Sequence, residues 1–302
     1  MREAAGTRPT TAPVSVLMLV AVVTLVWGTN WSLFPLVVRE LSVWTFRAVA
    51  LFFCGAVLLG LAKLRGQSLA VPRSSWGVMV GITLIYLVVW NIAITYSAIL
   101  MPSGQSAVLG FTMPLWAAII AWLFLGERLS ARMVAALLLG VAAVAMVMVP
   151  NFAAYAGAPL GFALGLLAAI GWAIGTLMFK RHRWTLPVLV LTGWQMLLTS
   201  VPITVGALVL GDAHWFMPSW QTIALVTYIT LVPMSIGSVC WFAIVNRLPV
   251  NVAGLSPVMV PVVAVISGAI VHGEPLGLLQ VAALTCSVAS LSLALLAPAR
   301  RF

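Results

Sequence analysis

Long apolar stretches alternate with short polar breaks along the whole chain. A helix rises about 1.5 Å per residue, so about 20 apolar residues cross a hydrocarbon layer of about 30 Å. Stretches of this length predict ten transmembrane helices, at approximately 14–38, 44–64, 76–96, 103–125, 131–149, 160–179, 186–210, 220–245, 252–271 and 276–297. The breaks are too short to hold a soluble domain. The pattern therefore predicts an all-α integral membrane protein.

The composition agrees with the apolar pattern. Hydrophobic residues make up 63% of the 302 positions and charged residues only 7%, whereas a soluble domain is about 25% charged. The net charge of +10 does not indicate a nucleic-acid partner, because the basic residues lie singly or in small groups between apolar stretches. The three cysteines all fall inside apolar stretches, so neither a disulfide framework nor a zinc site is expected.

The basic residues predict how the chain crosses the membrane. With ten crossings, alternate breaks face the same side, and cytoplasmic loops are rich in Lys and Arg. Thirteen of the fifteen Lys and Arg residues fall on one side, together with both termini: Arg2, Arg8, Lys63, Arg65, Arg73, Arg128, Arg132, Lys180, Arg181, Arg183, Arg247, Arg300 and Arg301. Both termini are therefore expected in the cytoplasm.

The chain contains an internal duplication. The segment 101–129 recurs at 248–276, with aligned prolines at Pro114 and Pro261 and an aligned Gly-Glu pair at each following turn. Because each copy holds five helices, an odd number, the second copy enters the membrane from the opposite side and the repeats are inverted. The predicted division is a cytoplasmic segment 1–13, a first five-helix repeat 14–150, a second 151–297 and a cytoplasmic tail 298–302.

These features resemble the EamA-type drug/metabolite transporter superfamily. The resemblance rests on the ten-helix double repeat, its two prolines and the turns at Gly126-Glu127 and Gly273-Glu274, and on Val26-Trp27-Gly28 and Trp44-Thr-Phe-Arg47. Within the superfamily the chain is most similar to bacterial exporters of aromatic and other neutral amino acids. The resemblance implies a bacterial inner-membrane carrier in which helices 1, 3, 4, 6, 8 and 9 surround a central cavity and helices 5 and 10 pack outside.

A set of neutral polar and aromatic residues within the spans is the candidate lining of such a cavity. Amides facing lipid would be left without hydrogen bonds, so the two asparagines of the first and third stretches favour a cavity. The candidates are Trp27, Asn30, Tyr86, Trp90, Asn91, Gln105, Trp172, Tyr228, Ser235 and Asn251. For the deeper tryptophans, plain helix packing is an equally good interpretation. A lining of this kind suits an uncharged or zwitterionic solute.

Three further residues carry a choice of interpretations. Arg47 is the charged residue well inside a span; it can pair with a substrate carboxylate, although snorkelling to the nearby membrane surface is the favoured interpretation. Pro114 and Pro261 each predict a kink near the middle of a span. They are candidate hinges for alternating access, and a static kink explains them equally well.

Ionisable residues are nearly missing from the predicted spans, which bears on the class of function. All five acidic residues and all three histidines lie near span ends or in loops. General acid/base catalysis, metal binding and nucleophile activation need such groups, so neither an enzyme nor a cofactor is expected. Ion coupling through a buried carboxylate is not expected either.

Several functions remain open on the sequence. The first is export of an amino acid through a monomer or weak homo-oligomer embedded in the lipid bilayer, with no nucleic-acid partner. The runner-up is a carrier of another neutral or cationic amphiphile, such as a drug or a nucleoside. A membrane-embedded enzyme and a structural subunit are weaker alternatives.

Overall fold

The structure, a computed structural model, describes residues 14–101, 103–126, 130–210, 217–248, 250–272 and 277–295, and all regular secondary structure in them is helical. The helices up to residue 157 are α1 (Val14–Val37), α2 (Val43–Leu64), α3 (Arg73–Thr83), η1 (Leu84–Val88), α4 (Val89–Leu100), α5 (Ser103–Gly110), α6 (Met113–Leu125), α7 (Ala131–Met148), η2 (Val149–Asn151) and α8 (Phe152–Gly157). Those that follow are α9 (Pro159–Arg181), α10 (Val188–Leu210), α11 (Trp220–Ile229), η3 (Thr230–Ile236), α12 (Gly237–Arg247), α13 (Val250–Leu255), α14 (Val260–His272) and α15 (Leu278–Leu295).

The described helices are those of an integral membrane protein. Eight helical segments are long and apolar enough to cross a membrane, and α7 and α15 are apolar but shorter. Each of the ten stretches expected from the sequence holds one or more helices, with breaks at residues 111–112 in the fourth and 256–259 in the ninth. The third and eighth stretches extend to 73–100 and 220–247. The all-α membrane class is confirmed. The count of ten crossings and the cytoplasmic termini stay predictions.

Two of the long helices contain a wider turn near their middle. The segments η1 and η3 are π-helical, each between two α-helical parts of one continuous helix. Pro233 lies inside η3, where the missing N–H of proline contributes to the disturbed hydrogen-bond ladder. A π segment inserts an extra residue into the helix and frees backbone carbonyls, and such segments are frequent at functional sites.

The two aligned prolines occur at helix breaks, not at kinks in continuous helices. The chain turns at residues 111–112 between α5 and α6 and at residues 256–259 between α13 and α14. Pro114 and Pro261 are each the second residue of the helix that follows. There the missing N–H costs nothing, because the first N–H groups of a helix have no partner within it. The kink predicted from the sequence is therefore a complete break.

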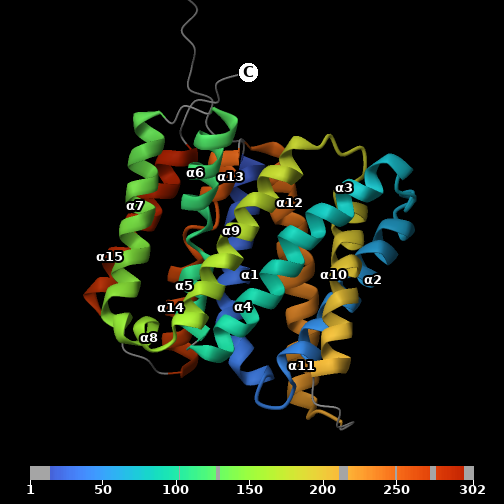
Figure 1. The fold of residues 1–302 in the computed structure, drawn as a ribbon, viewed down its shortest axis with the longest axis horizontal. Coiled ribbons are helices and arrows are strands. Elements are labelled where there is room, and N and C mark those ends of the chain that lie inside the picture. Colours follow the sequence, from blue (N-terminus) through green and yellow to red (C-terminus); the bar gives the residue numbers. More distant parts are fainter. Residues whose placement is uncertain are drawn as a thin grey trace, which may run out of the picture.

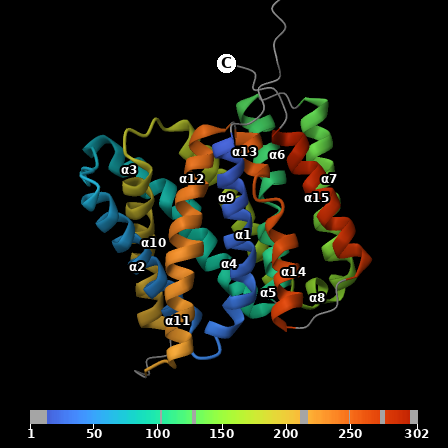
Figure 2. The same ribbon diagram turned by 180° about the vertical axis from the view of Figure 1, so that it is seen from behind.

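The part of the chain up to residue 157 and the part from residue 158 onward, called the two parts of the chain below, are interlocked. Figures 1 and 2 show α7 and α15 side by side at one edge of the molecule and α2 and α10 at the other, with α1, α4, α9 and α12 between them. Helix α1 packs against α12 and α14, whereas α9 packs against α4, α5 and α6. Each central helix therefore finds its neighbours in the other part of the chain.

Most of the described basic residues lie at one end of the molecule. Helices α2, α9 and α12 terminate there, with Lys63, Lys180 and Arg247 in their last turns (Figure 1). We call this the basic end. The connection between α1 and α2, with Arg39 and Glu40, lies at the opposite end.

Candidate functional site

A cavity of about 100 Å³ lies between the two parts of the chain. Its lining includes six residues singled out in the sequence: Trp27, Asn30, Arg47, Trp90, Asn91 and Trp172. The other lining residues are Trp31, Leu51, Leu87, Phe111, Met113, Met196, Pro233, Met234 and Ser238. The cavity therefore draws on α1, α2, η1, α4, the α5–α6 break, the start of α6, α9, α10, η3 and α12.

Aromatic rings form much of the cavity wall. The ring centroid of Trp172 lies 4.7 Å from that of Trp90 and 5.7 Å from that of Trp27, both in edge-to-face arrangements. Trp31 meets Phe111 edge to face at 6.0 Å. Edge-to-face pairs put the positive edge of one ring against the negative face of the next, which fixes the orientation of both.

Neutral polar atoms lie among the aromatic rings of this wall. The Asn30 Oδ1 and Trp172 Nε1 atoms are buried and have no hydrogen-bond partner among the described residues. The Asn91 amide nitrogen donates to the Leu87 carbonyl at 2.8 Å, which fixes the orientation of that side chain. An unpaired buried polar group costs about 1–3 kcal/mol. Two buried polar atoms of the lining residues, one acceptor and one donor, thus have no partner among the described residues.

One cation shares the cavity with these groups. Arg47 lies near the start of α2, and its Nε atom is buried. Leu51, one turn further along the helix, also lines the cavity. None of the described lining residues is acidic. The cavity is therefore a site of one charge sign, suited to an anionic group on a solute.

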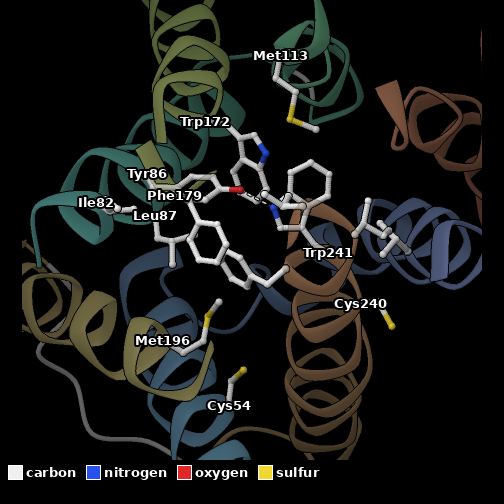
Figure 3. Packing of buried hydrophobic residues seen from close by; sticks show 14 of the residues in the cluster. Cys54, Ile82, Tyr86, Leu87, Met113, Trp172, Phe179, Met196, Cys240 and Trp241 are labelled. Atoms are coloured by element: carbon white, nitrogen blue, oxygen red, sulfur yellow. Dashed lines mark hydrogen bonds between the residues drawn. The ribbon is translucent and has the colours of Figure 1, made fainter. Parts of the chain in front are cut away.

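A cluster of buried aromatic side chains separates the cavity from the basic end. Figure 3 shows Tyr86, Trp172 and Trp241 converging, with Phe179 beside them. The Tyr86 hydroxyl accepts a hydrogen bond from the Trp241 indole N–H and is hydrogen-bonded to the Thr176 hydroxyl at 3.1 Å. Phe179 lies two turns beyond Trp172 toward the end of α9.

Comparisons with known proteins assign the family. The sequence model of the EamA-like transporter family matches residues 14–149 and 159–296. The chain belongs to this family. This EamA protein is 26% identical to the "Probable amino-acid metabolite efflux pump" of Escherichia coli, over 87% of the chain and 89% of that protein. It is 23% identical to the "Uncharacterized transporter YvbV" of Bacillus subtilis, over 91% of the chain and 90% of that protein.

Two further comparisons bear on location and fold. The EamA protein is 26% identical to the "Uncharacterized inner membrane transporter YedA" of Escherichia coli, over 85% of the chain and 82% of that protein. A protein of known crystal structure shares the fold with a TM-score of 0.77 at 19% identity, over 95% of this chain and 99% of that one. The chain is thus a multi-pass inner-membrane transporter of a small-molecule solute, and family and relatives indicate a transporter, not an enzyme.

Tyr86 is buried behind the cavity wall, and two other candidates of this EamA protein, Tyr228 and Gln105, are not among the lining residues. Tyr228 is 39% exposed, because the buried face of α11 carries Thr222 and Ile229, and Tyr228 points about 100° away from Ile229. Gln105 accepts a hydrogen bond from the Tyr155 hydroxyl at 2.8 Å.

Of the two remaining candidates, Ser235 is not a lining residue, and the side chain of Asn251 is not described. Ser235 donates to the Thr230 carbonyl at 2.7 Å within η3. Ser238, three residues further along the chain, lines the cavity in its place. Asn251 belongs to α13, but its side chain is outside the described part of the structure. Glu127 and Glu274 are outside the described residues altogether.

The sequence reasoning missed several lining residues that carry no polar signal. Met113 and Met196 are apolar, and nothing in the sequence separates them from core residues (Figure 3). Pro233 did carry a signal, because a proline in the middle of an apolar stretch disturbs the helix. Its carbonyl accepts a hydrogen bond from the Trp27 indole N–H at 3.0 Å, which joins α1 to η3 at the cavity.

Proposed function

We propose that this EamA transporter exports amino acids, the aromatic and other neutral ones first. The observation that carries the proposal is the content of the cavity: aromatic walls, one arginine, one free acceptor and one free donor, with no acid among the described lining residues. The name of the relative in Escherichia coli, an amino-acid metabolite efflux pump, supports the same class of solute.

A zwitterionic amino acid complements these groups. Arg47 offers charge-assisted hydrogen bonds to its carboxylate, and Asn30 Oδ1 accepts from its ammonium group. Trp172 Nε1 is a further donor to the carboxylate. The aromatic walls then hold an apolar or aromatic side chain through ring contacts. A cationic drug fits less well, because its charge would face Arg47 without a neighbouring acid.

Transport is proposed to proceed by alternating access around this cavity. The breaks before Pro114 and Pro261 supply two hinges at equivalent places in the repeat, where few helical hydrogen bonds oppose bending. Within the described residues Glu40 is the acidic side chain, and it lies in a loop. We therefore propose that the solute moves down its own gradient, without a carboxylate site for a coupling ion. We expect the transporter to act as a monomer or a weak homo-oligomer.

The test is solute uptake by liposomes that contain the purified protein, without an imposed ion gradient. We expect saturable uptake of labelled phenylalanine, and competition by unlabelled phenylalanine at least tenfold stronger than by phenethylamine, which lacks the carboxylate. A factor of ten corresponds to about 1.4 kcal/mol, within the worth of a buried charged hydrogen bond. Arg47→Gln should abolish this discrimination.

The matched control is Arg39→Gln, because Arg39 is exposed in the loop between α1 and α2. This variant should keep both uptake and discrimination. Equal competition by the amine in the wild type would contradict the role of Arg47. Absence of uptake for every amino acid, with uptake of a nucleoside or a drug, would overturn the amino-acid proposal in favour of the runner-up.

A further inference from the structure

A second cavity, of about 270 Å³, lies away from the central one. It is bordered by the α5–α6 break, by α7 and by α9, and its lining includes Pro114, Trp116, Val144, Phe162 and Leu166. Among the described residues, the two linings share Phe111, whereas Asn30, Arg47 and Trp172 belong to the central cavity and not to this one. The cavity therefore calls for its own explanation.

The lining of this second cavity is apolar and offers nothing to a polar ligand. None of the described residues that line it is charged, and the two polar side chains among them are hydrogen-bonded to each other. The Trp116 indole N–H donates to the Thr112 hydroxyl at 3.1 Å, and that hydroxyl donates to the Leu109 carbonyl at 2.6 Å. A bound water needs two to four polar partners, so the chemistry of this cavity suits an alkyl chain.

The second cavity is continuous with the lipid-facing surface. Val141 in its lining is 40% exposed. Leu138, three residues before Val141 in α7, is 63% exposed, and Leu167, next to the lining residue Leu166 in α9, is 49% exposed. Both belong to apolar helices of a protein that resides in a bilayer, where exposed leucines contact acyl chains. A dry protein cavity of about 150 Å³ already holds a benzene molecule, so 270 Å³ accepts a segment of alkyl chain.

The second cavity also adjoins both helix breaks. Phe111, in the first break, lines this cavity and the central one, so its ring stands between the two. Leu255 and Val258 belong to the end of α13 and to the second break, and they line the second cavity as well. We propose that an acyl chain of a membrane lipid occupies this cavity and supports the two breaks beside the solute site.

The experiment uses the full-length protein in nanodiscs made of phosphatidylcholine with brominated acyl chains, which quench tryptophan fluorescence on contact. The contribution of Trp116 is the difference between each protein and the same protein carrying Trp116→Phe. We expect strong quenching of this contribution. Ala145→Phe, which places a ring in the cavity, should reduce the quenching at least twofold, and Val144→Phe should do the same.

The matched control is Leu138→Phe, because Leu138 lies on α7, as Val144 and Ala145 do, but is not a lining residue of the cavity. It should leave the quenching of Trp116 unchanged. Variants are compared only if their melting temperatures match the wild type, and two filling variants guard against one that fails to fold. Equal quenching in filled and unfilled proteins, or quenching of Trp116 by aqueous acrylamide, would overturn the proposal. The readout is independent of the solute, so it stands apart from the transport assay.

Discussion

Single tryptophans in this protein serve both packing and hydrogen bonding at the cavity. Trp27 lies edge to face against Trp172, while its N–H donates to the carbonyl of Pro233 at 3.0 Å. In a bilayer, helix association depends on close packing and on interhelical hydrogen bonds, because lipid is as apolar as leucine. A residue that supplies both contacts joins two helices and shapes the site between them.

Close packing at Tyr86 requires a glycine on the facing helix. A methyl group at Gly175 would overlap the Tyr86 ring. We expect Gly175→Ala to destabilise the protein by about 1–3 kcal/mol, the usual cost of overpacking, measured as a lower melting temperature in detergent. Gly60→Ala is the control, because no heavy atom lies within 4 Å of the added methyl group. A Gly175→Ala protein as stable as Gly60→Ala would contradict the packing argument.

At the scale of elements, the helix termini are joined by side chains from other elements. Ser219 caps α11 by accepting from the Thr222 N–H, and Glu40 accepts hydrogen bonds from the Ser219 N–H at 2.8 Å and hydroxyl at 2.7 Å. At the basic end, Lys180 of α9 donates to the Val245 carbonyl of α12 at 2.8 Å. One contact therefore ties α11 to the α1–α2 connection, and the other ties α9 to α12.

The Glu40 contact should depend on pH. The hydrogen bonds from the Ser219 backbone and hydroxyl lower the pKa of the Glu40 carboxyl below its ordinary value. The contact therefore stabilises the fold at and above the ordinary carboxyl pKa of about 4.3, and it is lost as the pH falls through the lowered pKa. Melting temperatures of the wild type and Glu40→Gln should converge on acidification. A difference that stays constant down to pH 3 would contradict this.

The Lys180 contact should hold the end of α12 in place. Its ammonium group satisfies the carbonyls of Val245 and Asn246, which have no helical partner at a C-terminus. Lys180→Met keeps the apolar stem, so it should cost about 1–2 kcal/mol through the lost hydrogen bonds. We expect the Lys180→Met protein to show faster hydrogen exchange at residues 245–248 and a lower melting temperature than the wild type. The control is Arg181→Met, at an exposed neighbour that should change neither.

At the scale of the whole molecule, the two parts of the chain depend on each other. Helix α1 packs on α12 and α14, and α9 packs on α4, α5 and α6. At one edge the Ser290 hydroxyl of α15 donates to the Ala136 carbonyl of α7 at 2.6 Å. The cavity lies between these interlocked parts, so neither part holds a complete site alone.

Dividing the chain tests this dependence. Residues 1–157 and 158–302, produced separately, should each aggregate or be degraded, because the central helix of each lacks its neighbours. Produced together, they should form a complex that elutes like the intact protein in size-exclusion chromatography and keeps solute uptake. A single part that is monodisperse on its own would contradict the interlocked arrangement.

The sequence determined much of this protein by itself. Apolar length alone located the helices, because a bilayer demands about 20 apolar residues per crossing. The motifs around Pro114 and Pro261 indicated the family, which the match over 14–149 and 159–296 shows. Amides and indoles inside apolar stretches indicated the polar part of the cavity, since such groups are costly in lipid. Five of the residues singled out on these grounds line one cavity, and Arg47, singled out for its charge, lines it as well.

Only the tertiary structure decided which faces meet. Tyr228 and Ser238 lie on one helix and both carry hydroxyls, yet one faces outward and the other lines the cavity. The sequence could not separate them, because a helix with a π turn at η3 changes the direction of the following side chains. Met113, Met196 and Phe111 are lining residues only because distant helices approach there. Apolar residues look alike in sequence, and their roles depend on what packs against them.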